Sequence, residues 1–312
     1  MIRYWNKVVS LVEKKACSKT FQKVRDSKPI QYTYNPELVI VSQVYSGALD
    51  MSLLALKSFI KMIGEGRVEV IDDGSLTKSD HELLHHHIPH LTIVHIDDID
   101  VGSCPKGSCW ERLIHILKLS QDAYVIQVDT DTLTIAPVPE VYNGFKANKA
   151  FTIGGEPNWP EPIPVEYISH ISRNKISEHI QVKSERQLEH VESINLTHYC
   201  RGCAAFAGFP KQAVTFDQLQ AFSAEMEERI GADTWRNWGS EQFSANVMIS
   251  LCPEPSVLPW PKYLNHGFPF VENGQEKLES YTRLTSVLHF IGTYRYKHGV
   301  YRKLAKLVLS EL

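Results

Sequence analysis

A repeated alternation of strand-like and helix-like segments most constrains the fold of this chain. Short apolar stretches occupy residues 37–47, 67–75, 91–98 and 123–131, and amphipathic stretches of helical period separate them at 50–62, 80–90 and 109–120. Strands that are joined through helices form parallel sheets with right-handed crossovers. The sequence therefore predicts an α/β fold, in which helices flank a mostly parallel sheet. The alternation weakens after residue 150, where a proline-rich stretch begins.

The composition is that of an ordinary globular protein. The chain has 312 residues, of which 43% are hydrophobic. No apolar run approaches the ~18 residues that span a bilayer, and the N-terminus lacks the core of a signal peptide. We therefore expect a cytoplasmic protein whose six cysteines are reduced. The "CRGC" pair at Cys200 and Cys203 has no second C-x-x-C partner, which disfavours a zinc or redox site.

Charge is unevenly distributed along the chain. Both ends are basic and the body is acidic. Residues 2–24 place Trp5, Val8, Val9 and Val12 at helical spacing among lysines, which predicts a basic amphipathic helix. Such a helix could rest on the inner face of a membrane, although packing against the domain is the interpretation that we favour. The acidic body argues against a nucleic-acid partner.

Polar clusters follow three of the predicted strands. In parallel sheets, ligands bind where the carboxyl ends of the strands meet. The candidate residues at these ends are Ser42, Gln43, Tyr45, Asp72, Asp73, Asp129 and Asp131.

The strand "YVIQVDTD" ends in Asp129 and Asp131, an aspartate pair with one residue between. Carboxylate oxygens suit Mg²⁺ or Mn²⁺, ions that share their coordination with substrate phosphates. The alternative is that both aspartates merely form a turn or cap a helix. Asp72 and Asp73 could accept hydrogen bonds from a nucleobase or a ribose, and Arg112 could reach a phosphate.

The segment "LHFIGTYRYKHG" near the C-terminus offers further partners for a bound diphosphate. His289 could act as a third metal ligand. Gly292, Arg295 and Lys297 supply a flexible position and two cations that could cover a diphosphate. Metal and diphosphate would then be held by segments that lie far apart in the sequence.

Four segments together resemble the GT-A glycosyltransferases, and family 8 in particular, the group of glycogenin and the bacterial lipopolysaccharide galactosyltransferases. "WERLIHILKLSQDAYVIQVDTDTLT" is similar to that family's arginine-bearing helix and DxD strand, and "HFIGTYRYKHG" resembles its closing His-x-x-Gly segment. "YCRGCAAFAGFPK" and "WGSEQFSANVM" are similar to two further segments. The resemblance implies a GT-A, Rossmann-like domain at residues 37–290, with a nucleotide-binding half (37–135) and an acceptor half (136–290). Helical extensions, 1–36 and 291–312, would flank it.

The resemblance also implies an activity. The chain would move a sugar from a nucleotide-diphosphate donor, with a UDP-sugar expected, to a glycan or lipid-linked glycan. Mn²⁺ or Mg²⁺ on Asp129, Asp131 and His289 would neutralise the leaving diphosphate. Glu241 would be the base of an inverting enzyme, and Gln242 would steady the sugar cation of a retaining one, with retention favoured. The remaining donor contacts would come from Arg112, Gly202, Gly292, Arg295 and Lys297, and Asn246 would face the substrate.

Two alternatives compete with this interpretation. Haloacid-dehalogenase-like phosphatases also carry a DxD after a strand, but Leu133 departs from their motif, which in addition usually opens the domain. A catalytically silent nucleotide-sugar-binding protein would have no need of metal ligands.

Two further residue groups allow more than one interpretation. The histidines at positions 85, 86, 87 and 90 are expected to form a solvated helix end and not a metal site. Trp235, Trp238 and Trp260 could equally shape an acceptor cleft or belong to the core.

Overall fold

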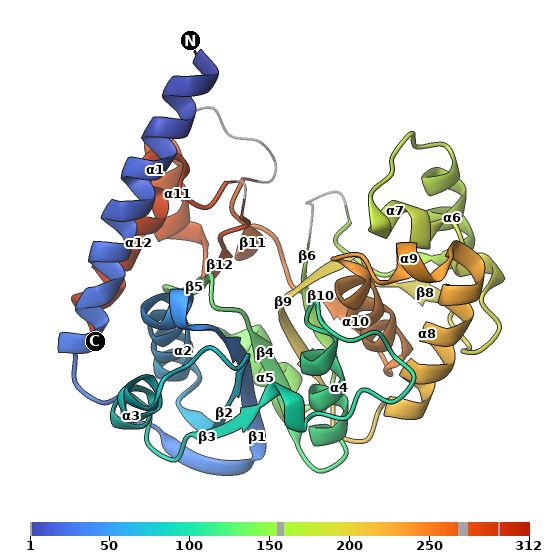
Figure 1. Cartoon of the computed structure of the whole chain (residues 1–312), viewed down its shortest axis with the longest axis horizontal. Coiled ribbons are helices and arrows are strands. Elements are labelled where there is room, and N and C mark those ends of the chain that lie inside the picture. The colour runs from blue at the N-terminus through green and yellow to red at the C-terminus, as the bar shows by residue number, and fades with distance from the viewer. Residues whose placement is uncertain (1, 155–158, 268–273, 293) are drawn as a thin grey trace.

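The computed structural model describes residues 2–154, 159–267, 274–292 and 294–312. Within these residues the main sheet has seven strands, in the order β10-β6-β9-β4-β1-β2-β3 (Figure 1). Their bounds are β1 (Thr33–Val44), β2 (Glu65–Asp72), β3 (Thr92–His95), β4 (Tyr124–Val128), β6 (Phe151–Gly154), β9 (Gly202–Phe209) and β10 (Ser256–Val257). The predicted strands β1 to β4 are parallel, as expected, whereas β9 runs antiparallel to both β4 and β6.

The crossover helices α2 (Leu49–Ile63), α3 (Lys78–His87) and α4 (Trp110–Leu119) lie where the sequence places them. α2 ends at Gly64, which adopts φ 78°, a conformation that glycine reaches without steric cost. α3 begins with a capping box between Thr77 and Asp80. Local sequence signals therefore mark the end of α2 and the start of α3.

The sheet separates two hydrophobic cores. Successive side chains of a strand point to opposite faces, and β1 shows this directly. Leu38 and Ile40 belong to the core that contains α2, whereas Val39 and Val41 belong to the core that contains α4. Burial on both faces explains why this strand is apolar without alternation.

A second, three-stranded sheet joins segments that are distant in the sequence. Its strands are β5 (Thr132–Thr134), β11 (Tyr263–Asn265) and β12 (Val287–His289). β12 pairs antiparallel with β5, which places His289 opposite Thr132, and parallel with β11, which places Asn265 beside His289. Because β5 follows Asp131 directly, this sheet carries the C-terminal histidine to the DxD segment.

The second half of the chain forms a helical region beyond β9, on the right of Figure 1. A short pair of strands, β7 (Ile163–Pro164) and β8 (His198–Tyr199), also belongs to this half. The helices after β5 are α5 (Pro139–Lys146), α6 (Val165–Arg173), α7 (Ile180–Glu185), α8 (Phe216–Ile230), α9 (Ala232–Trp235) and α10 (Ser240–Leu251).

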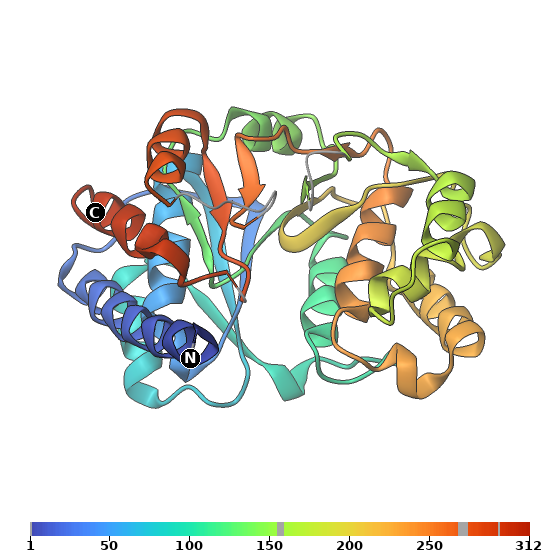
Figure 2. The same cartoon turned by 90° about the horizontal axis from the view of Figure 1, so that it is seen from above.

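Both ends of the chain are helical and lie together. α1 (Ile2–Phe21) packs along α12 (Val300–Leu309), and α11 (Gly274–Leu284) precedes α12 (Figures 1 and 2). Arg302 Nε donates to Glu13 Oε1 at 2.7 Å, and the rings of Phe21 and Tyr301 lie 4.6 Å apart. None of the described helices is long and apolar enough to cross a bilayer. The proposed domain boundaries stay predictions.

The prediction of a solvated helix end is confirmed for His85, His86 and His90 and is wrong for His87. His85 and His86 are exposed at the end of α3, but His87 is fully buried. Its Nδ1 lies 3.2 Å from Nζ of Lys57, which is also fully buried and donates to the carbonyl of Lys28 at 2.7 Å. Burial lowers the pKa of Lys57 to about 8 and that of His87 to about 4. His87 therefore helps to anchor the segment after α1 and does not belong to a solvated helix end.

Candidate active site

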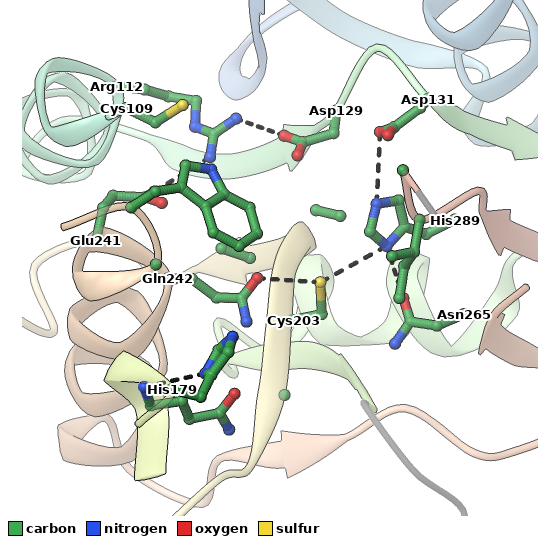
Figure 3. A pocket seen from close by; sticks show the side chains of 18 of the residues that line it. Cys109, Arg112, Asp129, Asp131, His179, Cys203, Glu241, Gln242, Asn265 and His289 are labelled. Carbon is green, nitrogen blue, oxygen red and sulfur yellow. Dashed lines mark hydrogen bonds and ion pairs between the residues drawn. The ribbon is translucent and has the colours of Figure 1, made fainter. Parts of the chain in front are cut away.

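A cavity of about 450 Å³ opens at the carboxyl end of β4. It lies between β9, the start of α10 and the segment that follows β12 (Figure 3). The predicted site residues that line it are Arg112, Asp129, Asp131, Gly202, Glu241, Gln242, His289, Gly292 and Arg295. Other lining residues, to which the sequence analysis assigned no role, include Cys109, His179, Gln181, Cys203 and Asn265. Trp238, for which the sequence left an acceptor cleft and the core open, also lines the cavity.

Asp131 and His289 face each other across the second sheet. His289 Nε2 lies 3.5 Å from Asp131 Oδ1, while Asp131 Oδ2 accepts a short hydrogen bond from Arg295. Burial opposes the charge on Asp131, but His289 and Arg295 together outweigh it and lower the pKa of Asp131 to about 2. Burial likewise opposes the charge on His289, yet Asp131 raises the pKa of the imidazole well above its usual value. The carboxylate is thus ionised and oriented by two cationic partners.

Asn265 determines how the His289 ring is oriented. Its Nδ2 donates to the carbonyl of Gly154 at 2.7 Å, which turns its Oδ1 toward His289 Nδ1 at 2.6 Å. An amide oxygen can only accept a hydrogen bond, so Nδ1 carries the proton and Nε2 is the nitrogen directed at Asp131. Metal-binding histidines are commonly held by such a partner on the other ring nitrogen. The sequence analysis missed Asn265.

Asp129 belongs to a second charged group. Arg112 Nη1 donates to Asp129 Oδ1 at 2.5 Å, and its Nη2 donates to Glu241 Oε1 at 3.2 Å. Arg112 is buried between the two carboxylates (Figure 3). Burial raises the pKa of Asp129, and it raises the pKa of Glu241 to about 7 although Arg112 opposes the shift. Arg112 therefore links the DxD segment of β4 to the first turn of α10.

The arrangement suits a divalent cation at Asp131 and His289. Carboxylate oxygen and imidazole nitrogen are ligands that Mn²⁺ accepts, and Asp131 Oδ1 and His289 Nε2 already face each other. The hydrogen bonds that Asp129 accepts from Arg112 and Gln127 both use Oδ1. In the described ranges, however, no three His, Cys, Asp or Glu side chains converge as a metal site. The ligand types fit a metal at Asp131 and His289, with Asp129 as the remaining candidate.

Gln242 and Cys203 lie at the centre of the cavity. The thiol of Cys203 donates to Gln242 Oε1 at 3.4 Å and also lies 3.6 Å from His289 Nδ1 (Figure 3). All six cysteines are free thiols, so the "CRGC" segment forms no disulfide. Arg201 pairs with Glu185 at 2.8 Å. Asn246, expected to face the substrate, is instead fully buried and donates to the carbonyl of Gly202 at 2.9 Å.

Six residues predicted to bind the donor are not among those that line this cavity. Asp72 accepts from Gly74 N and from His81 Nε2, each at 2.8 Å, and Asp73 accepts from Ser75 N at 3.0 Å. Both carboxylates thus stabilise the turn after β2. The other four are Ser42, Gln43, Tyr45 and Lys297. A donor role for these six stays a prediction.

Two of these six residues, Ser42 and Gln43, have a side-chain oxygen without a hydrogen-bond partner among the described residues. Ser42 Oγ and Gln43 Oε1 are buried at the carboxyl end of β1 without a hydrogen bond to any described residue. Lys297, by contrast, is exposed and lies over the ring of Tyr294 at 4.3 Å.

Comparison with known proteins identifies the fold. No protein-family model and no curated protein matches the sequence. A structure of an active-site mutant of LgtC matches with a TM-score of 0.51 at 12% identity, covering 87% of this chain and 95% of that chain. The bifunctional glycosyltransferase WbbM gives a TM-score of 0.47 at 12% identity, over 91% of this chain but 53% of its own length. Mouse xyloside xylosyltransferase 1 gives 0.40 at 11% identity, over 85% and 99%. The chain has the GT-A-like fold that its sequence predicts.

Proposed function

We propose that the protein is a metal-dependent glycosyltransferase that uses a nucleotide-diphosphate sugar, with a UDP-sugar expected as donor. The observation that carries this proposal is the arrangement of Asp131 and His289, with the imidazole held by Asn265, inside a cavity at the carboxyl end of β4. The GT-A-like fold supports it, because ligands of open α/β sheets bind at this edge.

Charge on the departing diphosphate is the main obstacle to the reaction. A divalent ion held by Asp131, His289 and Asp129 would supply Lewis-acid stabilisation of the leaving group. Arg295 lines the same cavity and can offer its guanidinium to phosphate oxygens. Arg112 compensates the charges of Asp129 and Glu241, which lets both carboxylates remain close to the substrate.

In the transfer step, the bond between the anomeric carbon and the diphosphate oxygen breaks, and its electron pair leaves with the nucleoside diphosphate. The acceptor hydroxyl oxygen bonds to the anomeric carbon. In an inverting reaction, Glu241 takes the hydroxyl proton, and its raised pKa suits that role. In a retaining reaction, which the resemblance favours, Gln242 steadies the sugar cation and the proton passes to the leaving diphosphate. The anomer of the product, observed by NMR, distinguishes the two.

The alternatives receive less support. The DxD segment follows the fourth strand and lies beside the antiparallel β9, unlike a phosphatase motif that opens its domain. A silent binding protein would bind a nucleotide sugar without breaking it down.

We expect a glycan or lipid-linked glycan as acceptor.

The test is donor breakdown in the absence of any acceptor. Purified protein is incubated with a panel of nucleotide-diphosphate sugars in Mn²⁺, in Mg²⁺ or in EDTA, and the released nucleoside diphosphate is measured. We expect metal-dependent release from at least one donor. Asp131→Asn should lower that rate by about 100-fold or more. The matched control is Asp97→Asn. Asp97 lies outside the cavity, and its side chain is 66% accessible. Metal-independent rates, or no release from any donor, would refute the proposal.

A further inference from the structure

Trp238 is an exposed aromatic residue at the wall of the cavity. Its side chain is 71% exposed although it lines the same cavity as Asp131 and His289. Trp235, three residues earlier, is fully buried and packs against Trp110. The two tryptophans therefore differ in role: Trp235 is a core residue, whereas the indole of Trp238 is available to a ligand.

Two elements hold Trp238 at the cavity wall. Gly239 adopts φ 100°, and a Cβ at that position would lie 2.8 Å from Ile180 Cγ2. The start of α7 thus packs directly against the start of α10. This contact brings His179, which caps α7, and Gln181 to the cavity beside Trp238. An indole face and two polar side chains therefore share this end of the cavity.

This end is separate from the proposed metal ligands. Figure 3 shows His179 on the far side of Gln242 from Asp131. In this view Gln242, four residues after Trp238 in the sequence, lies between them. A molecule bound at this end would therefore approach a donor sugar across Gln242.

We infer that Trp238, His179 and Gln181 form the subsite for an acceptor sugar, and that this acceptor is a neutral pyranoside. The inference rests on the proposed function and specifies its acceptor. Pyranose rings have an apolar C–H face that stacks on aromatic side chains, and their hydroxyls pair with imidazole and amide groups.

The charges at this end favour a neutral ring. Arg201 is paired with Glu185 at 2.8 Å, and Glu241 is paired with Arg112 at 3.2 Å. Their charges are compensated within the protein, so an acidic sugar would gain little from them.

The experiment measures donor consumption against the concentration of neutral methyl pyranosides, with hydrolysis in water as the baseline. Methyl glucosides, galactosides and mannosides of both anomers serve as probes. We expect at least one to be glycosylated with saturation. Trp238→Ala should raise its KM by about 10-fold, and Trp238→Phe, which keeps an aromatic face, should restore most of the loss.

Tyr167→Ala is the matched control, because Tyr167 is also an exposed aromatic residue, 54% accessible, but is not among the cavity-lining residues. It should leave both KM and hydrolysis unchanged. If hydrolysis proceeds but no methyl pyranoside is used, or if Trp238→Ala leaves the acceptor KM unchanged, the subsite is wrong. Absence of hydrolysis would instead refute the proposed function.

Discussion

Replacing Asn265 tests the proposed metal site without requiring turnover. Asn265→Ala removes the oxygen that holds His289 Nδ1 at 2.6 Å and leaves Asp131 and His289 themselves in place. The ring can then rotate or change tautomer, and Nε2 no longer points reliably at Asp131. The variant should therefore bind Mn²⁺ more weakly even though no proposed ligand is altered.

The magnitude follows from the role of such supporting contacts. Loss of a partner to a metal-bound histidine typically weakens metal affinity by about 10- to 100-fold. That factor corresponds to roughly 1.4–2.7 kcal/mol of binding free energy. The substitution also removes the hydrogen bond from Asn265 Nδ2 to Gly154, which costs about 1 kcal/mol of folding stability.

Asn246 provides a control for the structural cost. It is also buried, and its Nδ2 donates to the carbonyl of Gly202 at 2.9 Å. Asn246→Ala should therefore lose comparable stability but keep its affinity for Mn²⁺. Mn²⁺ binding is followed by the electron paramagnetic resonance signal of the free ion, in the presence of UDP, and stability by urea unfolding. Equal Mn²⁺ affinities in wild type and Asn265→Ala would refute the role of Asn265.

Three further predictions concern single residues. If Glu241 takes the acceptor proton, kcat/KM should rise with pH through about 7, the pKa to which burial raises this carboxyl, and Glu241→Gln should lose that rise. Gly202→Ala should destabilise the fold by about 1–3 kcal/mol in urea unfolding, because its Cβ would lie 2.2 Å from Thr152 Oγ1. A Cβ at Gly292 would meet no atom within 4 Å, so Gly292→Ala should leave the stability unchanged. Burial lowers the pKa of Lys57 from 10.5 to about 8, so the unfolded chain binds more protons between these values. The unfolding free energy of wild type minus that of Lys57→Met should therefore increase by about 1–3 kcal/mol as pH rises from 8 to 10.5. If this difference does not change with pH, the lowered pKa is contradicted.

The first half of the fold was predictable because its signals are local. The strands that became β1 to β4 are short apolar runs, and two of the helices between them have caps, Gly64 after α2 and the capping box at the start of α3. The arrangement after β4 could not be derived in this way. β9 lies between β4 and β6 and runs antiparallel to both, and its pairing joins residues about 80 apart in the sequence with β4 and about 50 apart with β6. No local pattern in the β9 sequence "GCAAFAGF" indicates that pairing.

The candidate site shows the same division between local and long-range information. Asp131 and His289 were predicted from short motifs, whereas Asn265 carries no motif and acquires its role only through the pairing of β11 with β12. Asp72 and Asp73 show the converse. Their pattern resembles that of a ligand site, but their carboxylates are engaged by the turn that follows them. An acidic pair at a strand end is therefore ambiguous until the neighbouring backbone donors are known.

The two aspartates of the DxD segment are close in the sequence but differ in the side chains that they contact. Asp131 directly precedes β5 and meets His289, the last residue of β12, and Arg295 in the segment that follows β12. Asp129 stays at the end of β4 and meets Arg112, which also binds Glu241. Under the proposed function, both carboxylates would face the metal and the diphosphate, and Asp129 would in addition be linked through Arg112 to Glu241, the candidate base for the acceptor. A substitution at Arg112 should consequently disturb both substrates, whereas one at Arg295 should disturb the donor alone.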